Sequence, residues 1–237
     1  MSDNTRERCR AVPSAHTAMT THTSKRRLPA ATRRALIVDA ALDAFARNGY
    51  EGTSMGRIGT AAGVSRTVLY DHFPSKRALF AALLADTHAG LLSHLQAAMA
   101  ADVPMEERMR RGLDSFFAFA EHQPQAWKLL FPDRAPVDGE VATDYHRLRA
   151  ESNRLMAAML APEARRAGID TASTVGQAMF ALQQSALHGA VRWWHAHPDV
   201  EREQLVIAAM DLLWTGISGL ERGECWAQNG VGYGARA

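Results

Sequence analysis

Apolar residues recur at helical spacing along most of this 237-residue chain, and strand-type alternation of Val, Ile and Thr is scarce. In the first periodic stretch, for example, Ile37, Ala41 and Phe45 lie on one face of a helix that Thr32 could cap. Comparable stretches end at Gly, Pro or Asn. The pattern predicts an all-α chain with helices at 32–47, 53/54–62, 65–72, 76–100, 105–123, 125–131, 140–160, 171/173–195 and 200–219.

These elements divide the chain into four parts. Residues 1–28 are rich in Thr, Ser, Arg and His and lack periodicity, so we expect a disordered arm. Residues 29–80 hold three short helices, and residues 81–222 hold the longer ones. We therefore predict an N-terminal three-helix domain followed by a C-terminal helical bundle. Residues 223–237 are rich in glycine and are expected to form a flexible tail.

The turn between the second and third predicted helices is the most informative segment. Gly63 can end one helix in a backbone conformation that needs positive φ, Val64 provides an apolar plug, and Ser65 can cap the next helix. This order of residues is the sequence form of a helix-turn-helix motif. In the second helix of such a motif, Arg66 and Thr67 face outward, where a recognition helix meets base edges.

The charge distribution agrees with a nucleic-acid-binding segment. Residues 25–80 contain ten Lys and Arg against four Asp and Glu, although the whole chain has a net charge of only +2. A basic third beside an acidic remainder is typical of a DNA-binding domain joined to a domain that does not bind DNA. A basic solvated surface would give the same charge.

The residues around the motif resemble the DNA-binding domain of the TetR (tetracycline-repressor-like) family. The resemblance covers about residues 32–80 and rests on Ile58 and on three runs: Gly49-Tyr50-Glu51-Gly52-Thr53-Ser54-Met55, Ala62-Gly63-Val64-Ser65 and Leu69-Tyr70-Asp71-His72-Phe73-Pro74-Ser75-Lys76-Arg77-Ala78-Leu79. It implies a sequence-specific DNA-binding regulator. It also implies phosphate contacts from Tyr70, His72, Lys76 and Thr53 or Ser54, base contacts from Arg66 and Thr67, and a recognition helix that begins at Ser65.

Two glycines depart from the family pattern. Gly56 and Gly59 lie in the first helix of the motif, where the family more often has a polar residue and an alanine. Each glycine costs about 1 kcal/mol of helix propensity. Gly56 also has no side chain with which to read DNA, so we expect specificity to rest on the second helix.

The last two predicted helices have the pattern of a subunit interface. Bulky apolar residues run along each helix, and small residues beside them would let two helices approach closely. Two such helix pairs could form a four-helix bundle between two copies of the chain. The alternative is a monomer core, which would need only one apolar face on each helix. The predicted interface residues are Met179, Leu182, Gly189, Met210, Leu213, Gly216 and Ile217.

The middle helices carry a candidate pocket. Bulky apolar residues with few charges among them suit a cavity for a small apolar or aromatic effector, although any single one could be plain core. The predicted pocket residues are Phe116, Phe117, Trp127, Met156 and Phe180. We expect the long helix that starts at Lys76 to be the only element that touches both domains and therefore to carry the effector signal.

Other chemistry finds little support in the sequence. His122, His146 and His188 lack metal-ligand spacing, and we find no phosphate loop, nucleophile elbow or Cys-x-x-Cys motif. We therefore expect no metal, no cofactor and no enzymatic activity. Because no apolar run approaches the ~20 residues of a membrane span and no signal peptide is recognised, we expect a cytoplasmic protein without a membrane partner.

Three functions remain open at this point. A repressor that an apolar ligand releases from a palindromic operator would explain the motif, the charge asymmetry and the interface pattern together. An architectural DNA-binding protein would explain the basic third, but it would not need a long apolar second domain. A helical-bundle enzyme would explain the second domain alone.

Overall fold

The computed structural model describes residues 28–100, 102–132, 139–166 and 170–221. In these ranges the chain forms nine helices and no strand, as the apolar periodicity predicts. The predicted arm and tail lie outside the described residues, apart from Leu28 at the arm's edge. Cys9 and Cys225 also lie outside them.

Three helices form one end of the molecule: α1 (Ala30–Asn48), α2 (Met55–Ala61) and α3 (Arg66–His72). Gly49 and Gly63 end α1 and α2 with φ of 68° and 65°, which confirms the positive φ predicted at Gly63. The core of this end is apolar and includes Ile37, Phe45, Ile58 and Leu69.

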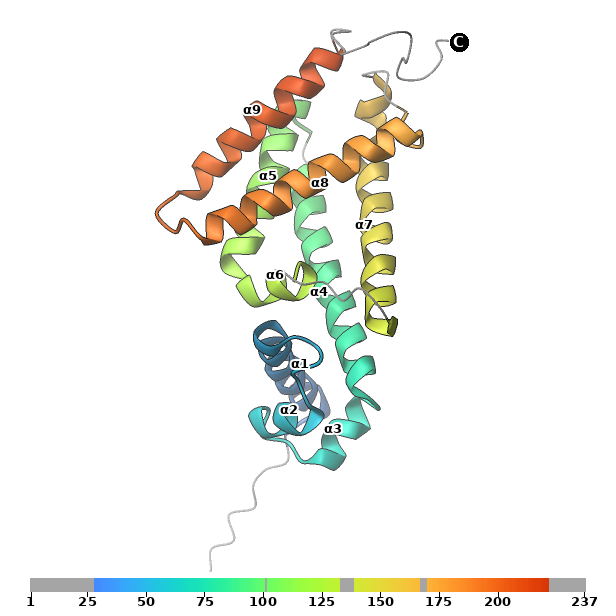
Figure 1. The fold of residues 1–237 in the computed structure, drawn as a ribbon, viewed down its shortest axis with the longest axis vertical. Coiled ribbons are helices and arrows are strands. Elements are labelled where there is room, and N and C mark those ends of the chain that lie inside the picture. Colours follow the sequence, from blue (N-terminus) through green and yellow to red (C-terminus); the bar gives the residue numbers. More distant parts are fainter. Residues whose placement is uncertain (1–27, 101, 133–138, 167–169, 222–237) are drawn as a thin grey trace, which may run out of the picture.

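The remaining helices form the longer domain: α4 (Lys76–Met99), α5 (Met105–His122), α6 (Pro124–Leu130), α7 (Gly139–Arg166), α8 (Thr174–His195) and α9 (Arg202–Glu221). Figure 1 shows α4 leaving the three-helix end and running into this domain beside α7. The helices α8 and α9 lie at the opposite end of the molecule from α2 and α3.

A second helix touches the three-helix end, so the prediction that the helix from Lys76 alone connects the domains was wrong. The short helix α6 packs against α1 as well as α4. Glu140 and Asp144, near the start of α7, form ion pairs with Arg77 at the start of α4. Such contacts join segments far apart in the chain, and apolar periodicity reports only which face of a helix is buried.

Two predicted helix boundaries also differ from the structure. The helix α1 begins at Ala30, with Pro29 before it, so Thr32 lies inside the helix and does not cap it. The helix α7 continues to Arg166, past the stop predicted at Pro162. A proline inside a helix removes one backbone hydrogen bond and strains the preceding turn, but the rest of a long helix can outweigh that cost.

The helix α4 is long and apolar enough, by length and composition, to cross a membrane. Its apolar residues have a different explanation in this fold, because α4 packs against α1, α5, α6 and α7. The residues that it buries are Leu79, Phe80, Leu83, Leu84, His88, Leu91, Leu92 and Leu95.

Candidate DNA interface and apolar surfaces

The outer face of α3 carries the residues predicted to contact DNA bases. Arg66 and Thr67 are exposed in its first turn, whereas Leu69 is buried beneath them. The Arg66 guanidinium lies 5.4 Å from the centre of the exposed Tyr70 ring. This cation–π contact keeps the cation on the outer face of the helix, where it remains free to donate hydrogen bonds.

Serine hydroxyls cap both helices of the motif. Ser54 Oγ accepts from the Arg57 backbone N–H, and Ser65 Oγ accepts from the Val68 backbone N–H, each at 3.3 Å. Both serines are exposed. Because capping uses the oxygen as an acceptor, each hydroxyl keeps its proton for donation to a further group such as a phosphate.

Thr53 is not available for the phosphate contact that the sequence suggested. Its side chain is buried, and its hydroxyl lies 2.8 Å from the Gly49 carbonyl and 3.1 Å from the Ala44 carbonyl. The hydroxyl therefore ties the turn after α1 back onto that helix. Of the two neighbouring hydroxyls, Ser54 is the one that faces solvent.

Lys76 turns inward in the structure, whereas the family resemblance implies a phosphate contact for it. Its ammonium donates to the carbonyls of Tyr50 and Thr53, at 2.9 and 3.1 Å, and lies 4.1 Å from the centre of the Tyr50 ring. A cation in the first turn of α4 opposes the helix dipole. Two carbonyls and an aromatic face compensate for it here, so no phosphate is needed to explain the residue.

His72 is half-buried in the last turn of α3. The structure also shows an exposed cation, Arg57, that was not predicted from the sequence. Arg57 is exposed on α2, whereas its neighbours Ile58 and Gly59 are buried. The signal was available in the sequence, because a charged residue beside buried apolar positions must lie on the outer face of a short helix.

Helices α8 and α9 expose large apolar side chains. Leu182 and Trp193 on α8 are 71% and 50% exposed, and Ile207 and Leu212 on α9 are 55% and 68% exposed. Isolated exposed leucines are common, but Val175, Leu182 and Trp193 follow one another at seven and eleven residues, which places them on one face of α8, as at an interface. We name the exposed apolar residues of the two helices, Val175, Leu182, Trp193, Ile207 and Leu212, the apolar stripe.

The predicted interface residues fall unevenly on this stripe. Leu182 belongs to it, Met179, Met210 and Leu213 are half-buried, and a Cβ at Gly189 would meet nothing within 4 Å. Gly216 and Ile217 lie in α9, at positions whose exposure is outside the described part. Ile207 and Leu212 were not predicted as interface residues from the sequence. Several faces of α9 are apolar, and contact with α5 decides which face is buried.

Three of the predicted pocket residues pack against one another in the core. Phe116 lies 5.6 Å from Phe117 and 5.3 Å from Trp127 between ring centres, and all three are buried. The rings of Phe131 and His188 extend this cluster and lie 4.2 Å apart. The other two predicted residues, Met156 on α7 and Phe180 on α8, are half-buried.

A buried polar pair joins α4 to α7 in the same domain. His88 is 7% exposed, and its Nε2 forms a short hydrogen bond with Ser152 Oγ. Burial lowers the pKa of His88, an effect that the Glu151 carboxylate opposes in part. The ring is therefore held neutral at neutral pH. Among the described residues, no three His, Cys, Asp or Glu side chains gather into a metal-binding group.

Two family models match the chain. The model described as "Bacterial regulatory proteins, tetR family" matches residues 37–83, and the model described as "Tetracyclin repressor-like, C-terminal domain" matches residues 94–224. The second model alone covers more than half of the sequence. The chain therefore belongs to the TetR family, as the residues of its helix-turn-helix indicated, and it is a DNA-binding transcriptional regulator.

Relatives and solved structures agree with this assignment. The transcriptional activator FasR of Mycolicibacterium smegmatis is 27% identical over 192 residues, which cover 81% of this chain and 86% of FasR. A TetR-like regulator from Rhodococcus sp. RHA1 is 28% identical, with a TM-score of 0.62 and coverage of 81% and 100%. FadR of Bacillus subtilis, solved with stearoyl-CoA, shares the fold at 16% identity, with a TM-score of 0.60 and coverage of 80% and 98%.

Proposed function

We propose that this regulator works as a homodimer that binds a near-palindromic operator and is released by a small apolar or aromatic effector. The proposal rests on one observation: two different kinds of exposed residue lie at opposite ends of the molecule. Arg66 and Thr67 are exposed on α3 at one end, and the apolar stripe is exposed on α8 and α9 at the other. One surface suits a DNA groove, and the other suits a second copy of the chain.

In this proposal the apolar stripe pairs with itself across a two-fold axis. Complete burial of a leucine contributes about 1.5–3 kcal/mol, and a two-fold interface uses every residue twice. Leu182 and Leu212 are both more than two-thirds exposed in one chain, so each has most of this contribution to gain. The dimer would then present two α3 helices to half-sites one or more DNA turns apart, about 34–36 Å for one turn.

At each half-site we assign the contacts from exposure and chemistry. Arg66 and Thr67 meet base edges in the major groove, where arginine can form two hydrogen bonds to guanine. Ser54, Arg57 and Tyr70 are exposed around this face and are placed to hold phosphates. His72 is a weaker phosphate candidate because it is half-buried.

The effector site belongs, in this proposal, to the domain formed by α4 to α8. Met156 and Phe180 are the predicted pocket residues that core packing leaves partly open, and the His88–Ser152 pair offers a polar group among apolar neighbours. Such a site suits a ligand with a long apolar part. Stearoyl-CoA is a reasonable first probe because FadR of Bacillus subtilis was solved with it.

The sign of regulation is part of the proposal. A repressor leaves its operator when the effector binds, and we assign this behaviour to the chain, acting on DNA in the cytoplasm. FasR is named an activator. Transcription of a reporter gene placed behind the operator distinguishes the two, because a repressor lowers and an activator raises the output.

The test starts from a random-sequence DNA library, from which the purified protein selects its preferred duplex. Affinity for that duplex is then measured by fluorescence anisotropy, with and without stearoyl-CoA. Enrichment of a two-fold symmetric sequence supports the proposal. Binding without sequence preference would indicate an architectural protein instead, and absence of DNA binding would contradict both.

A further inference from the structure

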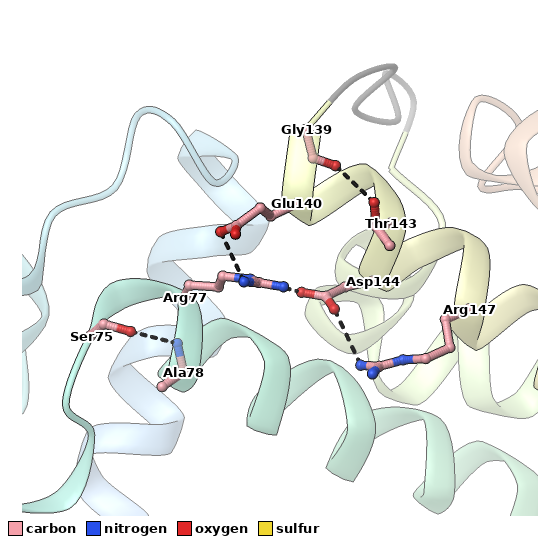
Figure 2. A network of polar contacts seen from close by, with 8 residues as sticks. All are labelled: Ser75, Arg77, Ala78, Gly139, Glu140, Thr143, Asp144 and Arg147. Carbon is pink, nitrogen blue, oxygen red and sulfur yellow. Dashed lines mark hydrogen bonds and ion pairs between the residues drawn. The ribbon is translucent and has the colours of Figure 1, made fainter.

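A charged cluster joins the start of α4 to the start of α7, close to the helix-turn-helix. Figure 2 shows Arg77 of α4 between Glu140 and Asp144 of α7, with Arg147 on the other side of Asp144. Arg77 Nη1 lies 2.8 Å from Glu140, and Arg77 Nε lies 3.4 Å from Asp144. Arg147 Nη2 lies 3.2 Å from the second oxygen of Asp144.

Asp144 is the buried member of this cluster. Its side chain is 6% exposed, whereas those of Arg77, Arg147 and Glu140 are 42%, 71% and 73% exposed. A buried carboxylate needs charged partners to offset its lost hydration, so Asp144 strongly favours the arrangement in which Arg77 reaches it. Arg147 belongs to the same helix as Asp144, and Arg77 is therefore the member of this cluster that joins Asp144 to α4.

An aromatic contact supports the same junction from the next residue. The ring of Tyr145 lies 5.9 Å from that of Phe80 on α4, and its hydroxyl donates to the Leu129 carbonyl of α6 at 2.7 Å. Phe80 in turn lies 5.0 Å from both Phe45 and Tyr50, at the end of α1 and in the turn after it. The start of α7 is thus connected, through Phe80 of α4, to the DNA-binding unit, which we define as α1–α3.

The position of Arg77 makes the junction relevant to DNA binding. It follows Lys76, whose ammonium holds the turn between α1 and α2, and α3 ends five residues earlier at His72. A displacement of the first turn of α7 would therefore pull on a residue that is closely connected to the recognition helix.

We propose that Asp144 is a positioning residue that, through Arg77, holds the DNA-binding unit in one orientation relative to α7. This inference rests on the proposed function, in which two recognition helices must meet two half-sites together. If the unit becomes free to rotate, only a fraction of the molecules has the competent orientation, and the apparent Kd rises by the inverse of that fraction. Movement of α7 in the effector domain would act on the operator by the same route.

The first test measures orientation and needs no DNA. Spin labels are attached to cysteines at Asp39 on α1 and Asn153 on α7, both exposed, after Cys9 and Cys225 are replaced by serine. Labelled chains are diluted into an excess of unlabelled chains, and the distance distribution is measured by pulsed electron paramagnetic resonance. We expect Asp144→Asn to broaden the distribution clearly. A distribution as narrow as that of the unsubstituted chain would overturn the proposal.

The chain offers a matched control. Glu107 is also a carboxylate between two arginines, Arg110 and Arg111, but all three residues belong to α5. Glu107→Gln therefore removes a similar ion-pair cluster without touching the junction, and it should leave the distribution unchanged. If Asp144→Asn does not fold, Arg77→Gln tests the same contact from its more exposed side.

The second test uses the operator selected by the unsubstituted protein and a duplex that contains one half-site. If the competent fraction in Asp144→Asn falls to about one tenth, operator affinity falls about tenfold, whereas half-site affinity stays the same. Equal losses on both duplexes would overturn the proposal, because they would indicate damage to α3 itself. If no operator can be selected, the proposed function fails, and the spin-label distances still decide whether Asp144 fixes the orientation.

Discussion

The ammonium of Lys76 lies 3.1 Å from the backbone carbonyl of Thr53, so the first residue of α4 is hydrogen-bonded to the turn that precedes α2. The same ammonium donates to Tyr50 in that turn. One side chain therefore connects the start of the long helix to the region where the helix-turn-helix begins. This contact makes the geometry of the motif depend on the position of α4.

We predict that Lys76→Met destabilises the DNA-binding unit. Hydrogen bonds to a charged group contribute about 1.5–3 kcal/mol, and the substitution removes two of them while leaving two carbonyls to find other partners. Urea unfolding, followed by circular dichroism, should show a loss of this order. The matched control is Arg57→Met, which replaces an exposed cation on α2. If both variants had equal stability, the structural role of Lys76 would be excluded.

Gly56→Ala should stabilise the protein by about 0.5–1 kcal/mol. Glycine in a helix loses more backbone entropy on folding than alanine does, and a Cβ at Gly56 meets nothing within 4 Å. Gly59→Ala is a useful comparison, because its Cβ would lie 3.4 Å from the Leu69 side chain. We expect a smaller gain there. A lower melting temperature for Gly56→Ala would contradict the open environment of this residue.

Leu182→Glu and Leu212→Glu should each convert the dimer to monomers. Each places a charge within the apolar stripe, where pairing with a second copy would bury one such charge from each chain. Sedimentation velocity at micromolar concentration provides the measurement, with Leu36→Glu on α1 as a control that also replaces an exposed leucine. A monomeric unsubstituted protein, or dimers of both stripe variants, would refute the assigned interface.

Lowering the pH should reduce the stability of the longer domain, α4–α9, through His88. Burial lowers the pKa of this ring, so below its ordinary value of about 6.5 the unfolded chain takes up a proton that the folded chain resists. The contribution of His88 to the free energy of unfolding is complete above this ordinary pKa. It is lost as the pH falls through the lowered pKa that His88 has in the folded protein. Urea midpoints for the unsubstituted protein and His88→Gln should therefore converge as the pH falls from neutral toward the lowered pKa. Parallel pH profiles would show that another group is responsible.

The local parts of the fold could be predicted from the sequence because their signals are local. Ser54, Ser65 and Ser75 cap helices, and Gly49 and Gly63 end them, through bonds that span a few residues. The family resemblance rests on the same local runs. From these features the helix-turn-helix and the outward face of α3 could be predicted.

The remaining features depend on partners far along the chain. Thr53 and Lys76 match a family pattern in sequence, but their hydrogen bonds depend on how α1, α2 and α4 meet in space. Arg77 and Asp144 are 67 residues apart, and no periodicity links them. Phe116 and Phe117 are buried, whereas Met156 and Phe180 are half-buried. This difference likewise follows from packing, because all four side chains are apolar and the sequence alone does not distinguish them.

DNA recognition by this protein is tested most directly by selecting DNA from a random library with the unsubstituted protein and with Arg66→Ala. Recognition by a pair of α3 helices predicts that the unsubstituted protein selects a near-palindrome whose half-sites are one or more helical turns apart. Arg66→Ala should bind that duplex about 1–3 kcal/mol more weakly and lose preference at one base position in each half-site. An unchanged preference in Arg66→Ala, or an enriched sequence without two-fold symmetry, would contradict recognition by a pair of α3 helices.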